Sequence, residues 1–151
     1  MLVVLAIAAM VAADQLVKYW AVVVLKPRGS MVLWENVFEL RYVENRGAAF
    51  SILQDQRWLF VVGTVVAVAV MVYLLCRGGI THPVGRAALV LMIGGAIGNF
   101  IDRLLRGYVV DLFYIRLIDF PVFNVADICL TVGAVLLFWY VLFGGKGKKA
   151  Q

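Results

Sequence analysis

Four long apolar stretches alternate with more polar segments along the chain, at residues 1–25, 58–76, 87–105 and 125–143. Each is close to the roughly 20 apolar residues that a helix needs to cross the hydrocarbon layer of a membrane. The pattern predicts four transmembrane helices in a single domain, residues 1–151, with both termini on one side. The first stretch has no basic residue before its apolar run, which resumes after Lys18. We therefore expect it to remain as a span and not to be removed as a secretory signal.

The segment between the first two stretches has a different pattern. Over residues 31–44, apolar and polar positions roughly alternate, and Val, Phe, Tyr and Trp are frequent. This predicts a small antiparallel β-sheet between the first and second helices. Residues 77–86 contain Gly and Pro and predict a short loop at the opposite end of the bundle, together with a flexible basic tail at 144–149. The expected fold class is a mainly α membrane protein with four transmembrane helices and one small sheet.

Composition agrees with a membrane location and excludes several kinds of chemistry. Hydrophobic residues make up 64% of the chain and the mean hydropathy is +0.97. The net charge is +5 with a pI near 9.5, but the basic residues form no stripe, so we expect no nucleic-acid partner. Cys76 and Cys129 show no CxxC spacing and His82 stands alone, so we expect neither a disulfide nor a metal site. More basic residues lie on the sheet side than on the other, and this count leaves the orientation open.

Polar residues converge at one end of the predicted bundle. In an antiparallel arrangement, the ends of the first and third spans meet the starts of the second and fourth. An Asp at the centre of a membrane costs about 2.5–3.5 kcal/mol, so a chain that keeps several near the bilayer is using them. The residues at this end are Asp14, Lys18, Asn45, Arg46, Arg57, Asn99, Asp102, Arg103, Asp111, Asn124 and Asp127.

Several of these residues also have a purely structural interpretation. Asp14 and Lys18 are spaced i, i+4 and could form an ion pair, with Lys18 snorkelling to the interface. Asn124-x-x-Asp127 resembles a helix capping box. Asp102 has Arg103 and Arg106 nearby to neutralise it, which favours an organising role over catalysis. Gly94-x-x-x-Gly98 suits close helix packing.

Together the motifs resemble the lipoprotein signal peptidase (signal peptidase II) family. They are Asp14-Gln-Leu-Val-Lys18, Glu44-Asn-Arg-Gly-Ala-Ala-Phe-Ser51, Gly94-Gly-Ala-Ile-Gly-Asn-Phe-Ile-Asp-Arg103 with Gly107-Tyr-Val-Val-Asp111, and Phe123-Asn-Val-Ala-Asp127. The resemblance implies a monomeric aspartic endopeptidase of the bacterial inner membrane without a cofactor. It would cut diacylglyceryl-modified prolipoproteins just before the lipid-modified cysteine, in contact with membrane lipid. The sheet and site would face the extracytoplasmic side, and both termini the cytoplasm.

Matching the motifs residue by residue assigns roles. Asp111 and Asp127 correspond to the catalytic pair, and we prefer Asp111 over Asp102 because Asp102 has local partners. The residues that would shape the site or bind substrate are Asp14, Lys18, Asn45, Asn99, Asp102, Arg103, Asn124 and, by a looser match, Arg57. The segment Gly47-Ala-Ala49 would close over the substrate.

Two other classes of protein compete with this interpretation. Intramembrane Asp, Lys and Asn also build proton-coupled transporters. A membrane scaffold or chaperone would tolerate loss of both Asp111 and Asp127.

Overall fold

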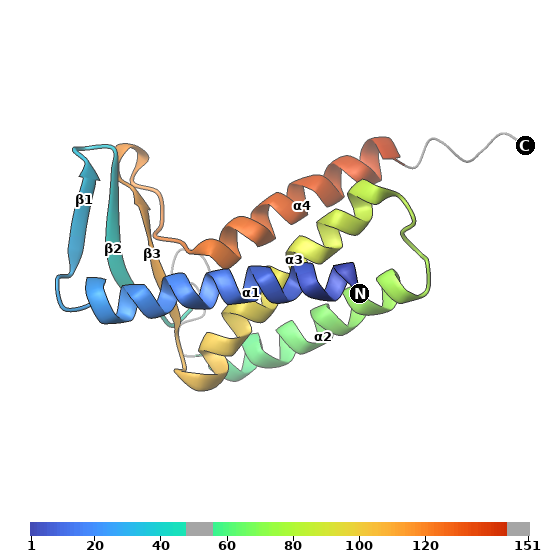
Figure 1. The fold of residues 1–151 in the computed structure, drawn as a ribbon, viewed down its shortest axis with the longest axis horizontal. Helices are drawn as coiled ribbons and strands as arrows, with labels where there is room; N and C mark the ends of the chain where they lie inside the picture. Colours follow the sequence, from blue (N-terminus) through green and yellow to red (C-terminus); the bar gives the residue numbers. More distant parts are fainter. Residues whose placement is uncertain (48–55, 145–151) are drawn as a thin grey trace, which may run out of the picture.

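The computed structural model describes residues 1–47 and 56–144, so the predicted closing segment beyond Gly47 and the predicted basic tail beyond residue 144 lie outside the described residues. Four helices in the described part are long and apolar enough to cross a membrane, which confirms the four predicted spans. They run along the long direction of the molecule, and the sheet lies at one end (Figure 1). The helices are α1 (Leu2–Trp20), continued by the π-helical segment η1 (Ala21–Leu25), α2 (Arg57–Cys76), α3 (Pro83–Leu105) and α4 (Val125–Phe143).

Helix α3 is the centre of the bundle and packs against each of the other three. Its small residues allow this. A Cβ atom added at Gly95 would lie 2.4 Å from the carbonyl oxygen of Ala126 in α4, and one at Gly94 would lie 2.8 Å from Met10 of α1. Without a strong hydrophobic drive between helices in lipid, such close approach of backbones is a main source of association. The predicted role of the glycines in helix packing is confirmed.

Helix α3 begins earlier than predicted. The loop was expected to continue to residue 86, but the helix starts at Pro83. Pro83 occupies the first helical position, where its missing N–H costs nothing, and the His82 ring accepts a hydrogen bond from the Val84 N–H at 3.3 Å. His82 and Pro83 were therefore a signal in the sequence for the start of this helix.

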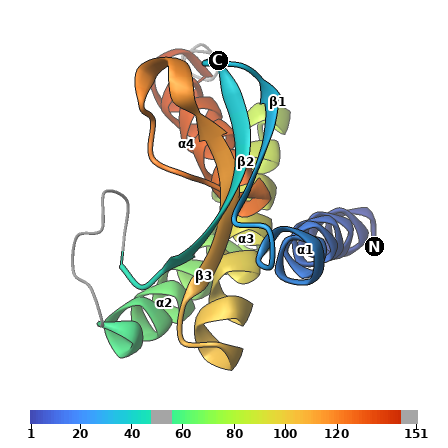
Figure 2. The ribbon, with the colours of Figure 1, turned by 90° about the vertical axis from the view of Figure 1, so that its left-hand side faces the viewer.

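Within residues 1–47 and 56–144 the sheet has three antiparallel strands in the order β1-β2-β3. They are β1 (Ser30–Trp34), β2 (Phe38–Asn45) and β3 (Val109–Ile115). The first two confirm the predicted sheet. The third joins from beyond α3 and was missed, because residues 109–115 were interpreted as a connection. Figure 2 shows the sheet in front of the helix ends, with β3 passing from α3 toward α4.

The sheet is fastened to the end of the first span by an apolar cluster. Ala21 and Leu25 of η1 are fully buried against Leu40 of β2 and against Val110 and Leu112 of β3. Burying one side chain such as Leu or Val contributes about 1.5–3 kcal/mol. Because Asp111 lies between two of these buried residues, the cluster holds its backbone in place.

Candidate active site

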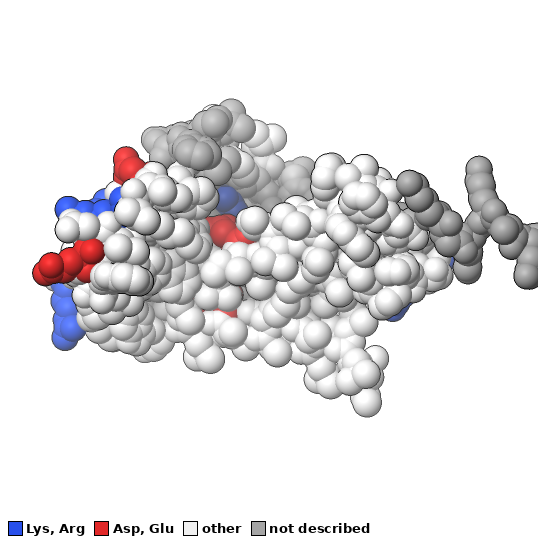
Figure 3. Space-filling view, turned by 90° about the horizontal axis from the view of Figure 1, so that it is seen from above, with Lys and Arg blue, Asp and Glu red and all other residues white. Residues whose placement is uncertain are grey.

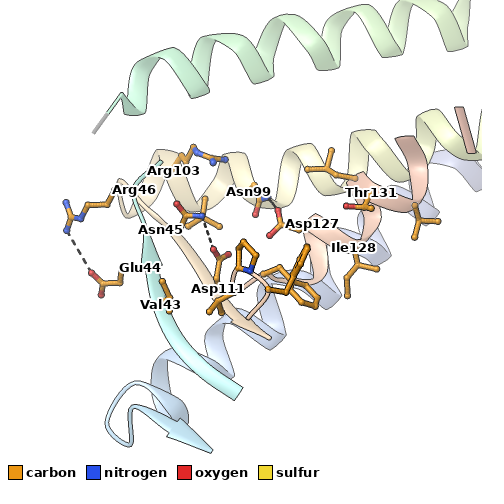
Figure 4. Close-up of a pocket in the computed structure, with 17 residues that line it drawn as sticks. Val43, Glu44, Asn45, Arg46, Asn99, Arg103, Asp111, Asp127, Ile128 and Thr131 are labelled. Atoms are coloured by element: carbon orange, nitrogen blue, oxygen red, sulfur yellow. Dashed lines mark hydrogen bonds and ion pairs between the residues drawn. The ribbon is translucent and has the colours of Figure 1, made fainter. Parts of the chain in front are cut away.

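A cavity of about 700 Å³ opens between the sheet and the helices. Asp111 and Asp127 both point into it, Asp111 from β3 and Asp127 from the first turn of α4 (Figure 4). Its other polar lining comes from Glu44, Asn45, Arg46, Asn99, Arg103 and Thr131. The sequence prediction that Asp111 and Asp127 converge agrees with this geometry.

Asp111 is almost completely buried, with 1% of its surface exposed. Its carboxylate accepts two hydrogen bonds from amides, one from Asn45 Nδ2 at 2.9 Å and one from Asn124 Nδ2 at 2.6 Å. Burial, and then the nearby charge of Asp127, raise the pKa of Asp111 from 3.8 to about 7, against the opposing effect of the two amides. Near neutral pH this carboxyl is therefore able to hold a proton.

Asp127 is held on both of its oxygens. Asn99 Nδ2 donates to Oδ1 at 2.7 Å, and the backbone N–H of Asn124 donates to Oδ2 at 3.1 Å. The Asn124 side chain in turn accepts from the backbone N–H of Asp127 at 2.9 Å, which completes a capping box at the start of α4. The capping and site interpretations thus hold together, because the box fixes the carboxylate at the cavity wall.

Two asparagines connect the carboxyl groups. Asn124 Nδ2 contacts both Asp111 Oδ1 and Asn99 Oδ1, the latter at 3.1 Å, while the amide nitrogen of Asn99 reaches Asp127. An amide side chain can donate and accept hydrogen bonds at the same time. The two linked amides therefore fix the orientation of one carboxylate relative to the other. The pair is positioned by one continuous network.

Lys18 is the buried cation behind this network. Its Nζ lies 2.9 Å from Asp14 Oδ2 and 3.2 Å from Asp102 Oδ2, and it donates to the side-chain oxygen Oδ1 of Asn99 at 2.8 Å. The ion pair with Asp14 that the spacing allowed is present, but Lys18 does not snorkel to the interface as that interpretation supposed, since the residue is 0% exposed. A buried ammonium is tolerated only with such partners, and two carboxylates on α1 and α3 provide them.

Asp102 organises the start of β3. Besides Lys18, it contacts Arg106 at 3.2 Å and accepts a hydrogen bond from the backbone N–H of Val110 at 3.1 Å. Arg103, the other expected partner, instead donates to the Gly47 carbonyl at 3.2 Å and lies over the Phe60 ring. In the described part of the chain Arg103 therefore forms no direct ion pair with Asp102, and its charge acts on that carboxylate only from a distance.

Arg57 lies apart from the two aspartates. It donates to the Leu104 carbonyl at the end of α3 at 2.6 Å and sits beside the Trp58 ring. Among the described residues it is not part of the cavity wall. In this position Arg57 links the start of α2 to the end of α3.

Sequence reasoning missed two groups of residues at the site. Gln15 links α1 to α3 through the Gly98 carbonyl at 3.1 Å, and a Gln inside an apolar span next to Asp14 was the available signal. The second group is the apolar wall of the cavity, which gave no comparable signal because apolar residues are common in any transmembrane span. This wall includes Phe120, Pro121, Val122, Phe123, Ile128, Leu130 and Val132.

The fold and this site define a multi-pass membrane enzyme. The model of the family described as signal peptidase (SPase) II matches residues 6–143. The chain belongs to the signal peptidase II family, as its motifs indicated, and is therefore a peptidase, a hydrolase.

Individual relatives agree with this assignment. The chain is 43% identical to a lipoprotein signal peptidase of Clostridioides difficile (strain 630), over 95% of this chain and 96% of that one. It is 46% identical to a lipoprotein signal peptidase of Streptococcus pyogenes serotype M5, over 89% and 88%. A bacterial membrane enzyme solved by the in meso method at 2.3 Å superposes with a TM-score of 0.88 at 30% identity, over 99% of this chain and 94% of that one.

Proposed function

We propose that Asp111 and Asp127 are the catalytic pair of an aspartic endopeptidase that cuts diacylglyceryl-modified prolipoproteins just before the lipid-modified cysteine. Cleavage of lipoprotein signal peptides follows from the family to which the chain belongs. The assignment of the pair rests on one observation above all. Both carboxyl groups line one cavity and are joined through the Asn124 and Asn99 amides.

The raised pKa of Asp111 suggests how the pair divides its roles. Two neighbouring carboxyl groups do not both ionise readily, so they share one proton and titrate as a unit. The ionised member takes a proton from the attacking water, while the protonated member donates to the carbonyl oxygen of the scissile bond. The roles exchange when the amine leaves. General acid and base catalysis of this kind contributes about 10²–10⁴-fold.

Three asparagines act as positioning residues in this mechanism. Asn45 and Asn124 orient the Asp111 carboxyl, and Asn99 orients that of Asp127. Lys18, Asp14 and Asp102 hold Asn99 and the start of β3 from behind. Arg103 lies in the cavity wall, where its guanidinium is available to a backbone carbonyl of the substrate.

The cavity suits a substrate that is part lipid and part peptide. Its carboxyl pair lies at the end nearest the sheet, on β3 and the first turn of α4, whereas Ile128, Leu130 and Val132 extend the wall along α4 into the span. We place acyl chains and the signal helix against that apolar surface and the cysteine backbone at the carboxyl pair. The site would then face the extracytoplasmic side of the bacterial inner membrane, with both termini in the cytoplasm and a single chain sufficient for activity.

A pair of substrates tests the proposal. The full-length protein in proteoliposomes would be given one prolipoprotein in two forms, with and without the diacylglyceryl group, and the products identified by mass spectrometry. We expect cleavage before the cysteine only in the modified form, because the apolar wall contributes most of the binding of the acyl chains. Equal cleavage of both forms, or cleavage at another bond, would contradict the substrate assignment.

A further inference from the structure

The outer end of the sheet carries exposed apolar side chains, and all of them except Phe120 lie outside the cavity wall. We call this end the sheet tip. It consists of residues 32–37, where β1 turns into β2, and residues 116–120, which follow β3. The backbone N–H of Leu117 donates to the Val37 carbonyl at 3.3 Å, so the two segments lie side by side. The exposed apolar residues, each 44–68% exposed, are Val32, Leu33, Trp34, Leu117, Ile118 and Phe120.

The sheet tip is held in shape by its polar groups. The Tyr114 hydroxyl contacts the Asp119 carboxylate, and Arg116 lies 3.7 Å from Glu39. Asp119 adopts a left-handed backbone with φ of 48°, which an aspartate tolerates better than most residues. These two polar contacts lie within the sheet, while the apolar side chains, together with Glu35 and Asn36 in the turn, are left at the surface. A gathering of large apolar residues on a surface usually marks contact with a partner or a membrane.

The position of the sheet tip indicates which partner covers it. The strands run across the direction of the helices, and the tip projects sideways beyond the start of α4 (Figure 1). Because the helices cross the membrane along their length, strands that lie across them extend along its surface. In Figure 3, charged groups lie around the sheet end, with uncharged surface between them and over the helical body.

The tryptophans give a second indication of the level of the membrane surface. Trp20 ends α1 and Trp58 lies at the start of α2, so both lie at the sheet end of the bundle, and they are 37% and 65% exposed. Trp is enriched where the hydrocarbon layer meets water. Trp34, at 68% exposed, adds a third indole at this end of the bundle.

We propose that the sheet tip inserts its apolar side chains into the headgroup layer of the membrane that the helices span. Arg116, in the tip, and Arg41, further along β2, both pair with Glu39, and their side chains remain 50% and 43% exposed, which also suits them to contact lipid phosphates. Residues 116–120 lead directly into Pro121 and Phe123 of the cavity wall. Docking of the tip would therefore hold the cavity open beside lipid. This inference does not depend on the catalytic role of the aspartates.

Fluorescence of Trp34 tests the proposal. The variant Trp20→Phe, Trp58→Phe, Trp139→Phe keeps Trp34 alone, and its matched control keeps Trp58 alone. Both would be placed in proteoliposomes whose lipids are brominated near the glycerol end of the acyl chain. We expect the brominated lipid to quench Trp34 to an extent comparable with Trp58, which lies at the sheet end of α2. Aqueous iodide should quench Trp34 weakly.

Two results would overturn the proposal. Strong quenching of Trp34 by iodide, with none by brominated lipid, would place the tip in water. Protection from both quenchers that disappears when the protein is diluted with lipid would show that a second copy covers the tip. If the triple variant does not fold, the difference in emission between the wild-type protein and Trp34→Phe isolates the same signal, because Trp34 is exposed and its replacement perturbs little.

Discussion

Several ionisable side chains at this site depend on partners that are far away in the chain. Lys18 is separated from its partner Asn99 by 81 positions, and only the pairing of α1 with α3 brings them together. The sequence therefore predicted the i, i+4 pair with Asp14 correctly, but it could not predict that the ammonium is buried. The sequence predicted which polar residues lie together at one end of the bundle. It could not predict which of them form hydrogen bonds or ion pairs with one another.

The pH dependence of cleavage tests the state of Asp111. Its pKa is raised to about 7 by burial and by Asp127, so the carboxyl is protonated below that pH and ionised above it. Above pH 7 the pair loses the proton that it must donate, and we expect kcat/KM to fall on the alkaline side with a midpoint near 7. Asn45 stabilises the ionised form through its bond to Oδ2. The variant Asn45→Ala should therefore move this midpoint to higher pH.

Thr131→Val is the matched control for that shift. Thr131 also lines the cavity, but in the described part of the chain it makes no hydrogen bond to the Asp111 carboxyl. Its replacement should leave the alkaline midpoint unchanged, whatever it does to the rate. A midpoint that stays fixed in Asn45→Ala, or one that lies near pH 4 in the wild-type protein, would contradict the assigned state of Asp111.

At the scale of elements, β3 shows what sequence patterns could and could not supply. Its run of Val, Leu, Phe, Tyr and Ile is typical of a strand, and Asp111 in the middle obscured the signal because buried strands rarely carry a carboxylate. The bulge between Leu40 and Val43 places Val43 opposite Asp111. No sequence rule gives that register.

Asn124 both caps helix α4 and positions the Asp111 carboxyl, and two substitutions can separate these roles. A Ser at this place can still accept the Asp127 N–H as an N-cap, but it cannot reach the Asp111 carboxyl. We expect Asn124→Ser to unfold near the wild-type temperature while kcat falls, and Asn124→Ala to lose in addition about 1 kcal/mol of stability. Thermal unfolding in detergent and initial rates measure the two effects. Full activity in a well-folded Asn124→Ser protein would leave Asn124 as a cap only.

The packing of α3 against α4 gives a test by glycine substitution. A Cβ at position 95 would meet the Ala126 backbone at 2.4 Å, whereas one at Gly63 of α2 has nothing within 4 Å. We expect Gly95→Ala to lower the free energy of unfolding by about 1–3 kcal/mol through overpacking. Gly63→Ala, on a face open to lipid, should leave stability unchanged or slightly higher. Equal unfolding temperatures for the two variants would contradict the packing described for α3.

For the molecule as a whole, the distribution of polar groups separates the competing classes. The buried charges and amides gather at the sheet end, while the far halves of the described helices are almost wholly apolar. A proton-coupled transporter needs polar groups that lead to both faces of the membrane. A scaffold has no use for a carboxyl pair joined by two amides. Membership in the signal peptidase II family agrees with the remaining class, a membrane peptidase.

The central claim, that Asp111 and Asp127 are the catalytic pair, is tested most directly by cleavage of a diacylglyceryl-modified prolipoprotein by Asp111→Asn and Asp127→Asn. Asn preserves the size of each side chain and removes its proton chemistry, so we expect cleavage to fall at least about 10²–10⁴-fold in either variant. Asp119→Asn, in the exposed turn after β3, is the control and should cleave normally, since Asn also tolerates the left-handed backbone there. Appreciable cleavage by folded Asp111→Asn or Asp127→Asn protein would contradict the account.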